Sequence, residues 1–371
     1  MRRALGGLVF VVVLLGAGLS HAQEPGGCTW ARDAGTTRDA ILNGVDAVDP
    51  QNAWAVGYFL GGNWSRTLVR HWDGESWETQ ASPSVDEQTN ILNDVAFGPE
   101  GTGWAVGERS RLTAKTVVQR YNGTRWRMQR SLNPSKTLNS LDAVDVSPTG
   151  TVYAAGTKWD RKRQHRTMIQ RFDGEAWSVM RSGRLGFLRG IDAVADADVW
   201  AVGVETVDRR SGAYATHFDG TGWTRAALPD VPGRYSILNG VSAAATNDVW
   251  AVGFYMVADE SHPLVLHYDG TAWSVAELPE VEGGVVELND VSALDADTAV
   301  AVGERSDDAF GVDTRIVFEW DGTEWREAAL DDDIQSNWLN AVDLGPDGEA
   351  WAVGYHSTRP QTDYLLHRTC A

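Results

Sequence analysis

The chain has 371 residues, with 32 Lys and Arg against 51 Asp and Glu, so its formal net charge at pH 7 is −19. This acidic balance argues against a nucleic-acid partner, although the charge is unevenly distributed. Residues 101–186 hold 16 basic and 6 acidic side chains, whereas residues 240–340 hold 3 basic and 22 acidic ones. One sector of an acidic protein is therefore basic.

Residues 1–22 have the pattern of a secretory signal peptide. Arg2 and Arg3 precede an apolar run at residues 8–15 that is too short to span a bilayer, and Ser20-His21-Ala22 matches a cleavage site. No second hydrophobic stretch of spanning length follows. We therefore predict a secreted or periplasmic protein without a membrane span, in which residues 23–371 form one domain.

Seven copies of one pattern fill that domain, each with a leucine twelve residues before a Trp-Ala-Val-Gly-like motif. The first residues of the motifs, spaced 47 to 51 apart, are Trp54, Trp104, Tyr153, Trp200, Trp250, Val300 and Trp351. The first six copies each have four strand-like segments, and Asp-Gly or Asn-Gly joins the last two, for which we expect type I′ turns. Four-stranded units with a period of roughly 40–50 residues are typical of β-propeller blades. The predicted fold is an all-β, seven-bladed propeller with four antiparallel strands per blade, and the blades start near residues 41, 91, 140, 187, 237, 287 and 338.

The seventh copy lacks a fourth strand because the chain ends after YLLHRTCA. The segment CTWARDA at residues 28–34 matches ESWETQA of the first copy, with Trp30 aligned on Trp77, so we expect it to complete blade 7. The two cysteines of the chain, Cys28 and Cys370, would then flank the missing hairpin turn. In an exported protein this placement predicts one disulfide that closes the ring, with two unrelated thiols as the alternative.

The Asp-Gly-x-x-Trp hairpins and Trp-Ala-Val-Gly strands resemble the Asp-box repeats of sialidase-like propellers. They are also similar to the repeats of photosystem II assembly-factor propellers and of secreted bacterial WAVG-repeat proteins. The resemblance covers almost all of residues 23–371, but Asp and Gly are adjacent here and no regular Ser or Thr precedes the Asp. The resemblance implies the fold. A sialidase activity would further require an arginine triad and a Tyr-Glu pair at the channel mouth.

One residue of each copy is predicted to lie at that channel mouth. These residues are Asn43, Asn93, Asp142, Arg189, Asn239, Asn289 and Asn340. A single arginine does not supply a triad, and we expect the amides to hydrogen-bond the local backbone of the turn before each copy. A glycan-active hydrolase or lyase would need further carboxylates near Asp142 and Arg189.

Metal and cofactor sites are not indicated. His71, His217 and His267 occupy the same position in different copies, so they form separate sites, whereas zinc needs three or four converging ligands. The Asp-rich loops lack the spacing of an EF-hand, and nothing in the sequence requires calcium. We therefore predict no cofactor and no metal.

Binding residues are expected in the variable loops, which join the second and third strands of a copy and one copy to the next, on one face of the ring. Three of the 17 tryptophans fall there outside the repeat positions: Trp64, Trp159 and Trp338. The third copy adds a basic loop with Lys158, Arg161, Lys162, Arg163 and Arg166, and the second copy adds Arg109, Arg111 and Lys115. Exposed aromatic residues suit sugar or protein contacts, and basic clusters suit anionic partners. The alternatives are ordinary loop packing for the tryptophans and solvation for the basic loop.

Because no catalytic cluster is recognisable, the sequence favours a monomeric, non-enzymatic binding or scaffold module. Its ligand would be a protein or a glycan, and the basic loop suits an anionic one. A carbohydrate-binding lectin is the first alternative. A glycan-active hydrolase or lyase of the sialidase-like propeller type is the second.

Overall fold

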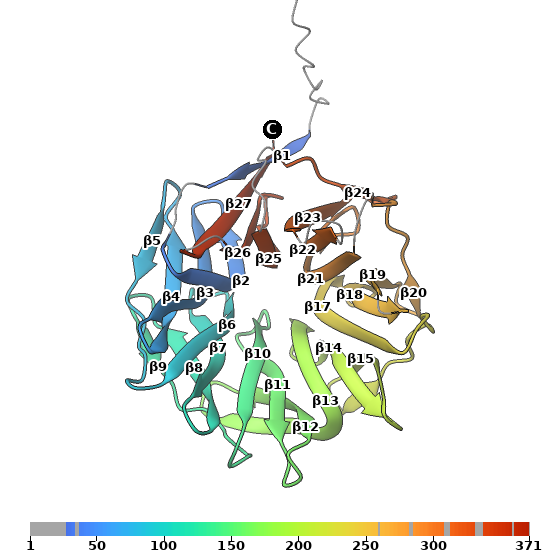
Figure 1. Ribbon diagram of the computed structural model, residues 1–371. Coiled ribbons are helices and arrows are strands. Elements are labelled where there is room, and N and C mark those ends of the chain that lie inside the picture. The colour runs from blue at the N-terminus through green and yellow to red at the C-terminus, as the bar shows by residue number, and fades with distance from the viewer. Residues whose placement is uncertain are drawn as a thin grey trace, which may run out of the picture.

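Seven blades of four antiparallel strands form a closed ring in the computed structural model (Figure 1). The structure describes residues 27–33, 37–258, 260–281, 285–307, 312–330, 337–357 and 360–370. The regular elements in these ranges are all β-strands, and none of the ranges contains a helix long and apolar enough to cross a membrane. The predicted signal peptide at residues 1–22 lies outside them. The predicted fold class is confirmed.

Each blade begins with an inner strand at the central channel and ends with a short outer strand (Figure 1). Blades 1 to 3 contain β2 (Ala40–Asp49), β3 (Asn52–Gly61), β4 (Trp64–Trp72), β5 (Trp77–Gln80), β6 (Thr89–Phe97), β7 (Gly103–Ser110), β8 (Ala114–Tyr121), β9 (Trp126–Met128), β10 (Asn139–Val146), β11 (Val152–Trp159), β12 (His165–Phe172) and β13 (Trp177–Ala195). Blades 4 and 5 add β14 (Asp198–Val207), β15 (Arg210–Phe218), β16 (Trp223–Arg225), β17 (Tyr235–Ala245), β18 (Asp248–Val257), β19 (Glu260–Tyr268) and β20 (Trp273–Val275). Blades 6 and 7 add β21 (Val285–Asp295), β22 (Thr298–Asp307), β23 (Val312–Trp320), β24 (Trp325–Glu327), β25 (Asn337–Leu344), β26 (Ala350–His356), β27 (Thr362–Cys370) and β1 (Cys28–Arg32).

Blades 3 and 4 share the long strand β13. Its residues 177–185 pair with β12 as the outer strand of blade 3, and its residues 186–195 pair with β14 as the inner strand of blade 4. A parallel bridge between Ser211 and Tyr235 then links blade 4 to blade 5, so blades 3 to 5 form one 11-stranded sheet. The chain therefore enters blade 4 directly, without the loop that separates the other blades.

The Asp-Gly hairpins form as predicted, but the turn type differs from the prediction. A type I′ turn needs positive φ at two adjacent residues. In blade 1, Trp72 pairs with Trp77 across a four-residue connection in which only Gly74 has a positive φ, at 95°. Oδ1 of Asp73 accepts hydrogen bonds of 2.9 Å from two backbone N–H groups of this connection. The aspartate therefore serves as an acceptor for the turn backbone rather than as a left-handed residue.

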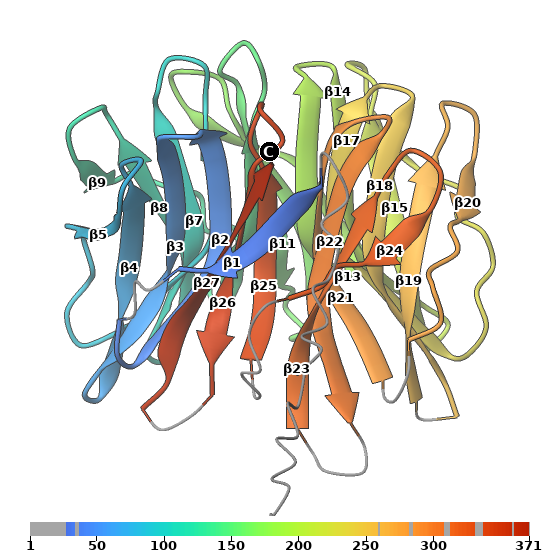
Figure 2. The ribbon, with the colours of Figure 1, turned by 90° about the horizontal axis from the view of Figure 1, so that it is seen from above.

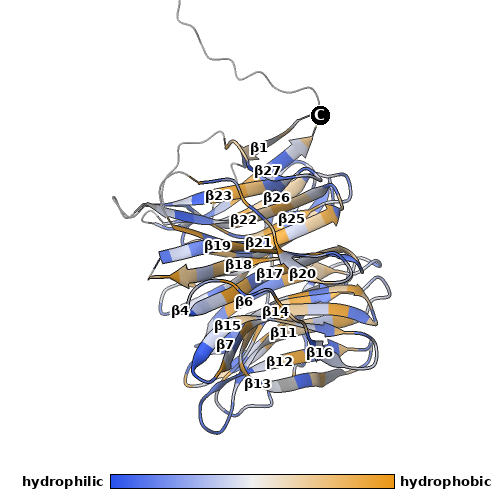
Figure 3. Cartoon of the chain, turned by 90° about the vertical axis from the view of Figure 1, so that its right-hand side faces the viewer, coloured by the Kyte–Doolittle hydropathy of each residue, from blue (hydrophilic) through white to orange (hydrophobic). Residues whose placement is uncertain are grey.

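The motif tryptophans fill the space between consecutive blades. Trp54 of blade 1 contacts three rings of blade 2 at centroid distances of 4.8–5.7 Å: Phe97, Tyr121 and Trp126. On its own blade it stacks on His71, at 4.1 Å. The same stack recurs at His217, His267 and His367. The repeated histidines therefore have a packing role. Figure 3 shows the hydrophobic stretches that run along neighbouring blades.

Strand β1 closes the ring by pairing antiparallel with β27 as the outer strand of blade 7, beside which it lies in Figures 1 and 2. Cys28 lies opposite Cys370, and the two form the predicted disulfide, with their Cα atoms 4.1 Å apart. Trp30 is 2% exposed, and its Nε1 donates a hydrogen bond of 2.8 Å to Glu319 of blade 6. The strand is therefore held by a covalent bond, a hydrogen-bonded ladder and a buried ring.

Candidate functional site at the channel mouth

Each blade presents one bulged residue to the central channel. In blade 1, Leu42 pairs with Gly57 and the register then shifts by one residue, so Asn43 is left over as the bulge. A Cβ on Gly57 would lie 2.0 Å from the carbonyl oxygen of Ile41, so only glycine allows the strands to approach this closely. The same shift follows the repeat leucine of every blade. The glycine of the Trp-Ala-Val-Gly motif thus permits the bulge that aims a side chain at the channel.

Five of the seven bulged residues are asparagines that clamp the next blade. Nδ2 donates to the backbone carbonyl of the next blade's repeat leucine, over N···O distances of 2.7–2.9 Å. The pairs are Asn43–Leu92, Asn93–Leu141, Asn239–Leu288, Asn289–Leu339 and Asn340–Leu42. The expected bond to the local turn backbone is therefore replaced by a bond between blades, because the bulge directs the amide around the channel.

Blades 3 and 4 break this pattern. Asp142 is a carboxylate and has no N–H to donate, and it instead accepts a 2.8 Å hydrogen bond from Ser140. Arg189 is exposed, and its guanidinium lies 5.2 Å from the ring centroid of Phe187, with no hydrogen bond to any described residue. The junctions on both sides of blade 4 thus lack the asparagine clamp, and two charged side chains face the channel instead.

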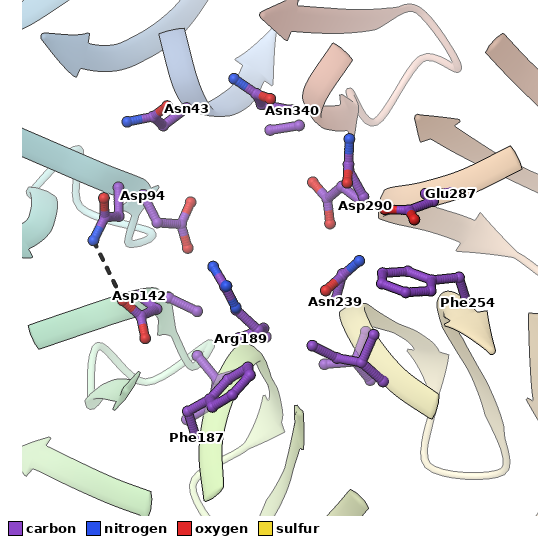
Figure 4. A pocket seen from close by; sticks show the side chains of 18 of the residues that line it. Asn43, Asp94, Asp142, Phe187, Arg189, Asn239, Phe254, Glu287, Asp290 and Asn340 are labelled. Carbon is purple, nitrogen blue, oxygen red and sulfur yellow. Dashed lines mark hydrogen bonds between the residues drawn. The ribbon is translucent and has the colours of Figure 1, made fainter. Parts of the chain in front are cut away.

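All seven bulged residues line one cavity of about 540 Å³ at the channel mouth. This volume lies within the roughly 300–1,000 Å³ of typical small-molecule sites. An aromatic wall from blades 4 and 5 completes the cavity with Phe187, Tyr235 and Phe254. Figure 4 shows Arg189 extending toward the middle of the mouth, with Asp94 and Asp142 on one side and Glu287 and Phe254 on the other. The departures from the repeat therefore converge on one space.

Four carboxylates line this cavity: Asp94, Asp142, Glu287 and Asp290. Asp94 and Asp290 each accept one backbone N–H of their own blade and one of the next, over 2.8–3.0 Å, so they join blades. Burial raises the pKa of Asp290 to about 7 and that of Asp94 well above its ordinary value. Burial also raises the pKa of Asp142, and the charge of Arg189 partly opposes this. Asp142 and Glu287 each keep one oxygen without a donor from the described residues.

Deeper in the channel, a second ring of acceptors joins the blades. The fourth residue after the repeat leucine accepts a backbone N–H of the next blade over 2.6–3.1 Å at Asp46, Asp145, Asp192, Ser242, Ser292 and Asp343. Burial raises the pKa of Asp145 and of Asp343 to about 6. In the described part of the chain, no group of three or more His, Cys, Asp or Glu is arranged to hold a metal ion. The four aspartates of this second ring act as acceptors for the backbone of the next blade.

The predicted basic loop of blade 3 contains two kinds of cation. Arg166 is fixed by Asp160, whose Oδ2 accepts hydrogen bonds of 2.8 and 3.0 Å from the guanidinium. Hydrogen bonds from the loop backbone, and the guanidinium of Arg166, lower the pKa of Asp160. Arg161, Lys162 and Arg163 are exposed and make no ion pair with a described residue. The three cations at the tip are thus available to a partner, and Arg166 shapes the loop.

The other predicted basic residues are more restrained. Arg109 donates to a glutamine at 3.2 Å, and Arg111 pairs with Glu87 at 3.1 Å. The guanidinium of Arg111 also lies 5.8 Å from the ring centroid of Trp64 on the neighbouring blade. Lys158 is half-buried at the end of β11. Arg109 and Arg111 are thus held against the connection between blades 1 and 2.

The three tryptophans predicted in loops lie at strand ends instead: β4 begins at Trp64, β11 ends at Trp159, and Trp338 is the second residue of β25. All three are half-buried, and none of them lines the mouth cavity. Trp64 lies under an arginine, and Trp338 stacks on a tyrosine of the adjacent strand with ring centroids 4.8 Å apart. The ring of Trp159 meets that of His165 edge to face. The ring centroid of His165 in turn lies 6.4 Å from that of Phe187 in the cavity wall. Of the three, Trp159 is thus connected to the mouth through a chain of rings.

Several residues of the cavity wall were not sequence candidates: Asp94, Phe187, Tyr235, Phe254, Glu287 and Asp290. Phe187 and Glu287 precede the repeat leucine, and Phe254 follows the motif glycine. Comparison of the seven copies shows that these two positions vary from blade to blade. Their orientation toward the mouth, however, depends on the strand pairing beside the bulge.

The fold and the site define a seven-bladed β-propeller with a ligand-sized cavity at its channel mouth. No family model and no curated protein matches the chain. Among solved structures, YCF48 bound to D1 peptide aligns with 92% of this chain and 96% of its own, with a TM-score of 0.57 and 13% identity. The GH74 xyloglucanase from Xanthomonas campestris aligns over 91% of this chain but 55% of its own, with a TM-score of 0.58 and 13% identity. The polysaccharide lyase Uly1 aligns over 88% of this chain and 89% of its own, with a TM-score of 0.55 and 11% identity. At these identities, the similarity establishes the propeller fold.

Proposed function

We propose that the protein is an exported, non-enzymatic binding or scaffold module whose ligand enters the channel-mouth cavity. The observation that carries this proposal is the local break in the clamp, where Asp142 and Arg189 replace asparagine on adjacent blades. The cavity opens on the face of the variable loops, because the bulges follow the connections between blades. Trp159 and the tip of the basic loop would extend the contact surface on that face. The disulfide suits an oxidising compartment outside the cytosol.

The state of the carboxylates supports binding over catalysis. Asp94 and Asp290 hold backbone N–H groups on both of their oxygens, so they are committed to the ring. Glycosidases use a pair of carboxyl groups that flank the scissile bond. Asp142 and Glu287 come from blades 3 and 6, and they share the cavity with Arg189. This combination keeps a glycan-active hydrolase or lyase as the second candidate.

The similar propellers are compatible with both candidates. The structure of YCF48 bound to D1 peptide aligns with this chain over 96% of its own length. The xyloglucanase and the lyase carry names that refer to polysaccharides. A peptide or glycan ligand at the mouth is therefore a reasonable first choice for the test.

The test is to probe the purified protein against arrays of peptides and of neutral and acidic polysaccharides. The variant Arg189→Glu reverses the charge in the mouth, and Arg125→Glu is its matched control on an exposed turn of the opposite face. We expect a ligand that binds the wild type and the control but not Arg189→Glu. A ligand that binds all three equally would place the site elsewhere. Shortened products after incubation with that ligand would instead favour the enzyme.

A further inference from the structure

We propose that the ligand of the mouth is an acidic saccharide, recognised through its hydroxyl groups and one carboxylate or sulfate. This inference rests on the proposed function, because it specifies the chemistry of the same cavity. It follows from the balance of hydrogen-bond donors and acceptors in the mouth and from the charge around it.

The cavity is rich in acceptors. A backbone carbonyl only accepts hydrogen bonds, so each of the five clamping asparagines must direct Nδ2 at the next blade. The amide oxygen of each of these cavity-lining asparagines then accepts no hydrogen bond from a described residue. Asp142 and Glu287 add carboxylate oxygens. A ligand that satisfies this surface has to bring many O–H or N–H donors.

Charged donors at the mouth are restricted to one side chain. Arg189 is the one cation among the residues that line the cavity, and it forms no ion pair with a described residue. A guanidinium that is not paired to the protein binds a carboxylate or sulfate of a ligand with a fork of N–H groups. The ligand therefore carries an anionic group beside its donors.

The aromatic wall lies next to this cation. Phe187 supports the guanidinium at 5.2 Å, and Tyr235 contacts Phe254 with ring centroids 5.9 Å apart. Rings of this kind pack against the C–H face of a sugar. The hydroxyl group of Tyr235 makes no hydrogen bond to a described residue, so it adds a second donor at the wall. A cavity of about 540 Å³ holds a short segment of such a chain.

The surface outside the mouth suits the continuation of an acidic polymer. Exposed cations without an ion pair to a described residue lie in loops of blades 3 and 4, or at the strand end beside them, on the mouth face: Arg161, Lys162, Arg163, Arg209, Arg210 and Arg234. We name these six residues the basic arc. Their charges attract a polyanion over a distance set by the ionic strength. The basic arc thus extends the recognition of negative charge beyond Arg189.

An acidic peptide fits the same arc but not the mouth. Each of its residues brings one backbone N–H donor but also a carbonyl and a carboxylate, so it would add more acceptors than donors to a cavity that already has an excess of acceptors, close to Asp142 and Glu287. A cationic ligand would satisfy the acceptors but would be repelled by Arg189 and the arc. A hydroxyl-rich anion satisfies both features, so we favour the saccharide.

The experiment measures binding of polygalacturonate, alginate and hyaluronan to the full protein by calorimetry. Two controls separate the features of the ligand: fully methyl-esterified polygalacturonate keeps the hydroxyl groups without the charge, and polyglutamate keeps the charge without the hydroxyl groups. We expect at least one acidic polysaccharide to bind, and its ester and polyglutamate to bind about 10- to 100-fold more weakly, because each lacks one set of charge-assisted or hydroxyl contacts.

Three variants separate the mouth from the arc. Arg189→Ala should weaken the acidic polysaccharide about 10- to 100-fold. The triple substitution Arg161→Ala, Lys162→Ala and Arg163→Ala should weaken it mainly at low salt, and Arg125→Ala should leave it unchanged. Thermal melting of each variant confirms that it is folded.

The outcomes are distinguishable. Polyglutamate that binds as tightly as the polysaccharides and loses affinity in Arg189→Ala would overturn the saccharide and leave the mouth as a peptide site. A neutral glycan that binds the wild type but not Arg189→Ala would show that the ligand is a saccharide without the proposed negative charge. If no acidic polysaccharide binds the wild type, the inference fails. If ligands bind but Arg189→Ala has no effect on any of them, the proposed function fails as well.

Discussion

Replacing both cysteines, Cys28→Ser together with Cys370→Ser, tests how the ring is closed. The disulfide joins residues separated by 342 positions. In the loop-closure model, removing a cross-link of this length returns about 6 kcal/mol of chain entropy to the unfolded state. The folded state changes little, because β1 still pairs with β27 and Trp30 stays buried. The loss of stability therefore comes from the unfolded chain.

This free energy corresponds to a defined shift in melting temperature. The entropy of unfolding is about 2.1 cal/mol/K per residue, which for ~340 residues gives about 0.7 kcal/mol/K. A loss of 6 kcal/mol then lowers Tm by about 8 °C. Calorimetry at one scan rate measures the shift, and the reduced wild type should melt together with the double variant.

The variant Trp30→Ala provides the contrast, because it keeps the disulfide and removes the buried ring. Truncating a buried tryptophan costs about 3–5 kcal/mol. A cysteine variant that melts within about 1 °C of the oxidised wild type, while Trp30→Ala is destabilised, would refute the argument from loop entropy. Packing and strand pairing would then be sufficient to close the ring.

Three further predictions concern the channel and the basic loop. Asn340→Ala removes the clamp between blades 7 and 1 and should cost about 1–3 kcal/mol of unfolding free energy, whereas Arg189→Ala makes no such bond and should melt like the wild type. Asp145 and Asp343 have folded pKa values of about 6, above the unfolded value of about 3.9. The folded state therefore binds these protons more tightly than the unfolded state. The contribution of the two groups to stability should accordingly fall as the pH rises from about 4 to about 6. Melting curves across this range should show a flatter dependence in the double variant Asp145→Asn, Asp343→Asn, and an identical slope would contradict the assignment. Asp160→Ala should speed amide hydrogen exchange in the basic loop with little change in Tm, and unchanged exchange would show that Arg166 and the backbone hold the loop without it.

Much of the fold could be predicted from the sequence because the repeat carries it. The spacing of motif tryptophans and leucines defines a blade, and the match of Trp30 to Trp77 places the N-terminal strand in blade 7. The turn type could not be predicted from the sequence, because an aspartate in a turn can either adopt the left-handed conformation or accept hydrogen bonds from the turn backbone with its side chain. The shared strand β13 was also not visible, since its two halves pair with different partners.

The ring of mouth residues was predicted by position, but the role of its amides was not. Sequence spacing gives the distance along one strand. The clamp from Asn43 to Leu92, however, joins the inner strands of two blades, and their relative position is set by the closed ring. The bulge at Asn43 that makes the clamp possible depends in turn on Gly57, which is 14 residues away in the chain. Phe254 and Glu287 were missed for the same reason, because they enter the cavity through strand pairing.

A repeat protein contains its own reference for judging a candidate site. Five blades use the bulged position for an asparagine clamp, so the structural demand at that position is known from the same molecule. At blades 3 and 4 the demand is not met, and the carbonyls of Leu188 and Leu238 receive no asparagine amide. The loss of two clamps costs stability, and such a cost is expected where the replacing residues, here Asp142 and Arg189, serve a function. Restoring the clamps with Asp142→Asn and Arg189→Asn should therefore raise Tm and lower the affinity for the ligand. If the variant is no more stable than the wild type and binds the ligand equally well, the break in the clamp has no functional cause.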